Sequence, residues 1–169
     1  MNAIALPAET QRRPFGIYAR VLATQILYMA PLFWLLELSQ NQAWKAANGE
    51  FGWVYPDSPY RWFSFGSMIL WAGSVFLMWT LHYYWFYPKG MKLWTRIAIA
   101  SVVCWVGEWV GGFLAVQLTG QHLHVWPGSK LVYVSFPALF FWVSNVIVYH
   151  LLTVYVVDLT PNYDVPADT

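Results

Sequence analysis

The sequence predicts an all-α integral membrane protein with four transmembrane helices. Of its 169 residues, 59% are hydrophobic and only 10% are charged, whereas roughly a quarter of the residues in a soluble domain are charged. The apolar residues fall into four blocks, and each block is close to the roughly 20 residues that a membrane-spanning helix needs. The chain is long enough for a single domain.

The four predicted spans are apolar on all faces, which is typical of helices surrounded by lipid. They cover residues 17–39, 62–87, 95–118 and 131–157. Basic residues gather at or just before the start of the first span, at Arg12, Arg13 and Arg20, and in and around the link between the second and third spans, at Lys89, Lys92 and Arg96. Because basic residues favour the cytoplasmic side, we expect a cytoplasmic-type membrane with both termini, 1–16 and 158–169, in the cytoplasm.

The two predicted two-helix halves resemble each other at an offset of 71 residues. Between positions 34 and 84, twelve residues recur 71 positions later: Trp34/Trp105, Glu37/Glu108, Gly49/Gly120, Val54/Val125, Pro56/Pro127, Ser58/Ser129, Ser64/Ser135, Phe65/Phe136, Trp71/Trp142, Val75/Val146, Leu81/Leu152 and Tyr84/Tyr155. This pattern predicts two tandem helix-loop-helix repeats, 17–87 and 88–157. Since each unit has two spans, both copies insert with the same orientation around a pseudo-twofold axis along the membrane normal.

Glu37 and Glu108 are the strongest candidates for function. Each lies within apolar sequence, "FWLLELS" and "CWVGEWVGG", where a carboxyl group is costly and faces the interior of the bundle. Two such groups around one axis form a candidate acid and base pair. Alternatively, each Glu accepts backbone N–H bonds and so holds the loop that follows it.

The chain contains 12 tryptophans, and those at span ends are typical interfacial anchors. As an alternative, the aromatic residues form walls around a flat lipophilic ligand such as a quinone, carotenoid, sterol or haem. On that hypothesis the ligand site includes Trp34, Trp71, Trp105, Trp142 and Asn145. For Asn145, hydrogen bonding between helices is the alternative.

Histidine supplies two further hypotheses. His82 and His150 lie at a similar depth on two predicted spans, so they are candidate axial ligands of a b-type haem. The loop motif "HLH" places His122 and His124 on one side of an extended segment, where copper or zinc would accept them. For His82 and His150, a hydrogen-bonded polar residue near the membrane interface is the alternative. For His122 and His124, no third ligand is evident nearby in the sequence.

Several classes of protein are not supported. The sequence has no phosphate-binding glycine loop and no basic stripe for nucleic acid. The single cysteine, Cys104, excludes an intrachain disulfide. Gly107 and Gly111 match a GxxxG packing face, which favours close helix contact. Contact with another membrane subunit or with a second copy of the chain is one form that this contact can take.

The run "GEWVGG", followed by "VWP" and "SFPALFFW", spans residues 107–142. It resembles a segment of the A subunit of copper membrane monooxygenases, in which a Glu-Trp pair precedes an aromatic-Pro loop. The order of Glu, loop Gly, aromatic residue and Pro also resembles membrane carotenoid hydratases and cyclases. Both resemblances are interpreted as a shared structural solution, and they assign the chain to no family.

Two functions therefore remain open at the level of sequence. The first is a membrane protein that binds or transforms a lipophilic small molecule, such as an isoprenoid, carotenoid, quinone or lipid, between the two repeats. The second is a non-catalytic subunit of a larger respiratory, photosynthetic or monooxygenase-type membrane complex that holds haem or pigment. Buried carboxyl groups favour the first, because a pure spacer need not contain them.

Overall fold

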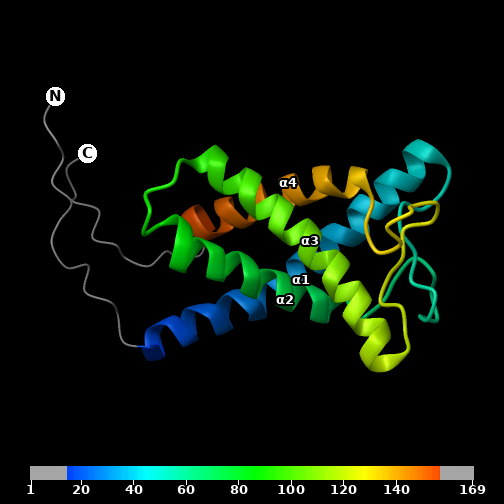
Figure 1. Ribbon diagram of the computed structural model, residues 1–169, viewed down its shortest axis with the longest axis horizontal. Helices are drawn as coiled ribbons and strands as arrows, with labels where there is room; N and C mark the ends of the chain where they lie inside the picture. The colour runs from blue at the N-terminus through cyan, green and yellow to red at the C-terminus, as the bar shows by residue number, and fades with distance from the viewer. Residues whose placement is uncertain (1–14, 157–169) are drawn as a thin grey trace, which may run out of the picture.

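The computed structural model describes residues 15–156, and this part of the chain is helical with no strand (Figure 1). Its elements are α1 (Phe15–Asn48), α2 (Ser67–Thr80), the π-helix η1 (Leu81–Phe86), α3 (Leu93–Thr119), α4 (Phe136–Leu151) and the π-helix η2 (Leu152–Val156). The prediction of an all-α fold is confirmed for this part. The predicted cytoplasmic ends, apart from residues 15 and 16, lie outside the described residues.

Among residues 15–156, three helices are long and apolar enough to cross a membrane: Ala19–Asn48, Leu93–Thr119 and Phe136–Tyr155. Each of them overlaps one of the predicted spans, and together they indicate a membrane protein. α2 has 14 residues, which is fewer than a spanning helix needs. However, η1 continues the same helical segment without a break through Phe86.

The helix ends differ from the predicted ends of the spans. α1 extends to Asn48, nine residues beyond the predicted end at Ser39, because helical structure outlasts the apolar run from which a span is predicted. Gly49, with a φ of 83°, follows the last helical residue of α1, and Gly120, with a φ of 72°, ends α3. Glycine adopts this left-handed conformation without steric cost.

α4 begins at Phe136, five residues after the predicted start at Leu131. Ser135 precedes it with extended backbone, and its side chain accepts a hydrogen bond from the backbone N–H of Ala138. Pro137 occupies the first turn, where the N–H that proline lacks would have no helical partner. The "SFP" sequence therefore fixes the point where the α3–α4 loop becomes helix.

Packing joins α1 to α2 and α3 to α4, and α2 lies against α3. The α1–α2 and α3–α4 loops meet at one end of the bundle, and the link between η1 and α3 lies at the opposite end (Figure 1). The core between the helices is apolar and includes Phe33, Trp71, Val75, Met78, Trp142 and Val146. Both predicted carboxyl residues lie near the loop end of this core.

Candidate functional site

Glu37, on α1, is held by two neutral donors. The hydroxyl of Tyr55 donates to Glu37 Oε1 at 2.8 Å, and Trp71 Nε1 donates to Oε2 at 2.8 Å. Trp53 Nε1 in turn donates to the Tyr55 hydroxyl at 3.1 Å. Burial, followed by the charge of Glu37, raises the pKa of Tyr55, so the phenol keeps the proton that it donates.

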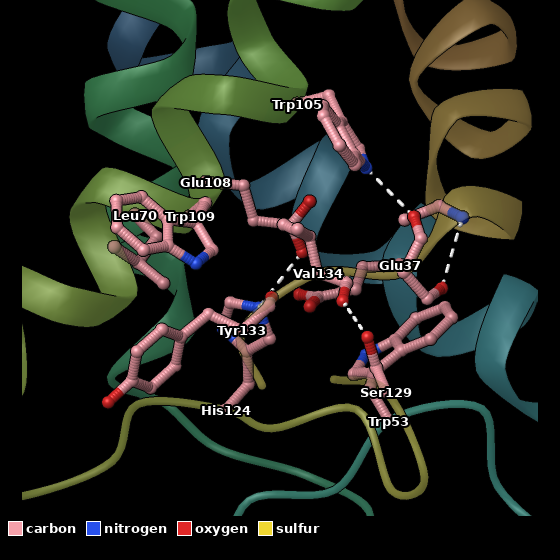
Figure 2. Close-up of polar contacts among 12 residues, drawn as sticks. Glu37, Trp53, Leu70, Trp105, Glu108, Trp109, His124, Ser129, Tyr133 and Val134 are labelled. Atoms are coloured by element: carbon pink, nitrogen blue, oxygen red, sulfur yellow. Dashed lines mark hydrogen bonds and ion pairs between the residues drawn. The ribbon is translucent and has the colours of Figure 1, made fainter. Parts of the chain in front are cut away.

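Glu108, on α3, has one neutral and one basic partner. Trp142 Nε1 donates to Glu108 Oε2 at 2.6 Å. His124 Nε2 lies 2.9 Å from Oε1, an ion pair drawn in Figure 2. The same nitrogen lies 2.8 Å from the carbonyl oxygen of Tyr133. With two acceptors beside it, Nε2 is the ring nitrogen that carries hydrogen.

The two loops that cover the carboxyl groups are joined to each other. Val54 and Val125 form an isolated antiparallel bridge, with backbone N···O distances of 2.9 and 2.8 Å. Asn41 on α1 secures the first loop: its amide donates to the carbonyl of Trp53 at 2.9 Å and accepts from the N–H of Gly52 at 3.0 Å. Loop conformation and carboxyl positions are thus linked.

A cavity of about 290 Å³ lies between α2 and α3 and reaches both carboxyl groups. Its walls are mainly apolar and its polar ends are Glu37 and Glu108; the lining also includes Ser67, Ile69, Leu70, Trp71, Gly73, Ser74, Leu77, Cys104, Gly107, Val110, Gly111 and Trp142. Ile69 is 73% exposed and Val110 is 39% exposed, so the rim lies on the outer surface of the bundle. The cavity volume is just below the range for small-molecule sites, roughly 300–1,000 Å³.

Several contacts recur after 71 residues. The bonds of Trp71 to Glu37 and of Trp142 to Glu108 are one such pair. Trp34 Nε1 donates to the carbonyl of Ser64 at 2.9 Å, and Trp105 Nε1 donates to that of Ser135 at 2.8 Å. The side chains of Trp71 and Trp142 also contact each other, with ring centroids 5.2 Å apart.

Some of the other predicted ligand residues lie away from the main cavity. Trp34 and Trp105 do not line it, because their side chains reach the starts of α2 and α4 instead. Asn145 accepts a hydrogen bond from Gln40 Nε2 at 2.9 Å, which joins α4 to α1. It lines a second cavity of about 30 Å³ that Glu37 and Glu108 also border, enough space for one or two water molecules.

The predicted haem ligands, His82 and His150, lie toward the end of the bundle that holds the η1–α3 link. His82 is 2% exposed, its Nδ1 lies 2.8 Å from the carbonyl of Met78, and its ring packs against Phe86 and Tyr149. The contacts of His82 and His150 neither support nor contradict haem ligation, so haem ligation by this pair stays a prediction. In the described residues, no three His, Cys, Asp or Glu side chains gather closely enough to hold a metal ion.

The two histidines of the "HLH" motif, His122 and His124, make different contacts. His124 points to Glu108, whereas the ring of His122 lies against that of Tyr133 and its backbone N–H donates to Asp57 at 2.6 Å.

Tyr55 and Asn41 were not predicted as site residues from the sequence. A signal for Asn41 was available, because an amide near the end of an apolar helix and before a glycine-containing loop is typical of a residue that binds backbone groups.

His124 is expected to make the stability of the protein depend on pH. Burial alone would lower the pKa of His124, but the hydrogen bond and charge of Glu108 outweigh it, so the pKa is raised above 6.5. The ion pair therefore stabilises the fold fully below pH 6.5, and this contribution is lost as the pH rises through the raised pKa of the folded state. We expect the melting temperature to fall across that interval.

The melting temperature of purified protein, measured between pH 6 and pH 9, checks this expectation. His124→Gln should flatten the profile, and His122→Gln, two residues away, should keep it. An unchanged slope in His124→Gln would show that another group produces the pH dependence.

Comparison of the chain with protein-family models, with curated proteins and with solved structures returns no match.

Proposed function

We propose that this protein is a four-span membrane protein that binds a lipophilic small molecule in the cavity between α2 and α3. The observation that carries the proposal is a cavity of about 290 Å³ with apolar walls and two carboxyl residues, Glu37 and Glu108. Apolar pockets with a few convergent polar groups are typical of ligand sites. Glu37 and Glu108 are the groups that contact the polar part of the ligand and the candidate acid and base of any reaction.

The proposed fourth span is α2 together with η1. Their continuous segment, Ser67–Phe86, has 14 and six residues in its two parts. At about 1.5 Å per residue, it is long enough for a hydrocarbon core of about 30 Å. Four spans leave both ends of the chain on the side of Lys89, Lys92 and Arg96, which the distribution of basic residues places in the cytoplasm.

The proposed two repeats place this cavity between them, since α2 belongs to the first copy and α3 to the second. In a twofold arrangement, equivalent residues near the axis contact each other. Val54 and Val125 are such a pair, and Trp71 and Trp142 are another. These reciprocal contacts support a duplication whose axis runs beside the two carboxyl groups.

The test uses Gly73, which lines the cavity from α2. No atom lies within 4 Å of a Cβ built at this position, so Gly73→Phe can fill the cavity without altering either carboxyl group. Met68→Phe introduces the same side chain on the same helix at a residue that is 37% exposed and does not line the cavity.

The protein and both variants are extracted gently from the native membrane, and bound small molecules are identified by mass spectrometry. We expect an apolar compound with the wild-type protein and with Met68→Phe, and a loss of about tenfold or more in Gly73→Phe, corresponding to at least about 1.4 kcal/mol. Equal amounts of the compound in Gly73→Phe and wild type would contradict the proposal. A visible spectrum of the same sample, with and without dithionite, shows whether the compound is a haem or a carotenoid.

A further inference from the structure

The polar groups that line the α2–α3 cavity offer a ligand almost only hydrogen-bond acceptors, because the donors among them are bound to other protein groups. Trp71 Nε1 donates to Glu37 and Trp142 Nε1 donates to Glu108. The hydroxyls of Ser67 and Ser74 donate to the backbone carbonyls of Ser64 and Leu70. Every strong side-chain donor among the described lining residues is thus already engaged, and only the thiol of Cys104, a weak donor, remains. A ligand meets carboxyl and hydroxyl oxygens.

The ionisable side chains that line the cavity include carboxyl groups but no basic group. None of the described residues that line the cavity is Lys, Arg or His. Glu108 is paired with His124, whereas the bonds to Glu37 come from the neutral side chains of Tyr55 and Trp71. Burial disfavours the ionised form of Glu37 unless a positive charge lies beside it, and a bound cation would supply that charge. With a cation bound, two carboxylates and the imidazolium of His124 leave one negative charge for the cation to balance, so this site is suited to receive one cation.

The apolar walls and the position of the rim define the rest of the ligand. Ile69 and Val110, at the rim, are both exposed on the outer surface of the bundle, which faces lipid if the helices span the membrane as proposed. Gly73, Gly107 and Gly111 keep the space between α2 and α3 open. A molecule dissolved in the membrane can therefore enter with its polar end toward the carboxyl groups and its chain toward lipid.

We propose that the ligand is a monovalent hydrophobic ammonium ion, a primary amine on an apolar chain, bound with Glu37 as its counter-ion. This inference rests on the proposed function and narrows its ligand class. The ammonium group supplies three donors and one positive charge, which are the two things that the lining lacks. A quinone, ketone or fatty acid supplies acceptors or a negative charge and leaves the carboxyl groups uncompensated.

The test uses two photoreactive probes that differ only at the polar end. Both carry a diazirine on the same alkyl chain, and one ends in a primary ammonium group and the other in a hydroxyl group. Each probe is added at pH 7 to the full-length protein in lipid nanodiscs, and the labelled residues are mapped by mass spectrometry. Because both probes dissolve in lipid, labelling of lipid-facing residues such as Phe140, which is 80% exposed, provides the internal reference.

We expect the ammonium probe to label the parts of α2 and α3 that line the cavity about tenfold more than the hydroxyl probe, relative to Phe140; charge-assisted hydrogen bonds of 1.5–3 kcal/mol correspond to at least that factor. Glu37→Gln, which keeps the shape and removes the charge, should remove this preference. Glu50→Gln, at an exposed loop carboxyl group, should keep it. Gly73→Phe should block cavity labelling by both probes.

The possible results separate the two proposals. Equal cavity labelling by both probes, blocked by Gly73→Phe, would overturn the ammonium assignment and leave the lipophilic site in place. Cavity labelling that Gly73→Phe does not change would overturn both. A preference for ammonium that survives Glu37→Gln would overturn the role of Glu37 as counter-ion and, with it, this inference.

Discussion

Replacing Glu108 by Ala should destabilise the protein by about 3–5 kcal/mol, the range found when one partner of a buried ion pair is removed. The substitution leaves Trp142 Nε1, which donates to Glu108 at 2.6 Å, without an acceptor. It also removes the counter-ion of His124, whose Nε2 lies 2.9 Å from Glu108 and keeps only the carbonyl oxygen of Tyr133. The His124 side chain is 4% exposed and that of Glu108 is 16% exposed. Water therefore replaces the lost carboxylate poorly.

Unfolding in mixed detergent micelles, followed by tryptophan fluorescence, measures this loss. The matched control is Glu50→Ala, which removes an exposed carboxyl group and should change the free energy of unfolding by less than about 0.5 kcal/mol. The double variant Glu108→Ala/His124→Ala should be less destabilised than the sum of the two single variants, because the residues are in direct contact. Additive effects would show that the ion pair contributes nothing.

Glu37 and Glu108 hold loops and also line the cavity, so the two alternatives that their sequence context raised do not exclude each other. Each Glu holds the loop that follows it, through Tyr55 for Glu37 and through His124 for Glu108. These contacts are made by side chains, whereas the backbone N–H groups of the first loop are bound by Asn41. Both carboxyl residues also line the cavity. Holding the loops and contacting a ligand are therefore compatible functions of the same oxygens.

The helices and the carboxyl residues could be predicted from sequence because both produce local signals. A long apolar run specifies a helix in lipid, and a Glu inside such a run is conspicuous. The partners of these residues depend on contacts distant in sequence. His124 was a candidate metal ligand because it follows His122 by two positions, but the Val54–Val125 pairing and the covering loops bring it to Glu108 instead. Tyr55 reaches Glu37 by the same loop arrangement.

The cavity could not have been predicted, because its existence depends on how α2 and α3 pack. The sequence showed Gly107 and Gly111 at a spacing that favours close helix contact. A Cβ at Gly107 would lie 3.2 Å from Leu77 Cδ2, and one at Gly111 would lie 3.5 Å from Leu70 Cδ2. These glycines thus face α2 within the chain. The same absence of side chains leaves room for the cavity.

Replacing Asn41 should cause the second large loss of stability, because its buried amide binds three backbone groups of the first loop. It is 1% exposed, donates to the carbonyl of Trp53 at 2.9 Å, and accepts from the N–H groups of Gly52 at 3.0 Å and Trp53 at 3.4 Å. Asn41→Leu keeps a side chain of similar size but leaves these groups without a partner. At about 1–3 kcal/mol for each buried unpaired group, we expect a loss on the order of 3 kcal/mol.

Because Asn41 holds the segment that carries Tyr55, its loss should also release the donor to Glu37. Hydrogen exchange of the backbone amides of residues 52–55 should increase in Asn41→Leu, and amides in the middle of α3 should exchange as in the wild type. Asn48→Leu is the matched control, since Asn48 is exposed and its amide donates only to the carbonyl of Trp44 on its own helix. Unchanged exchange at residues 52–55 would mean that the Val54–Val125 bridge alone fixes the loop, and that Glu37 owes its position to Trp71.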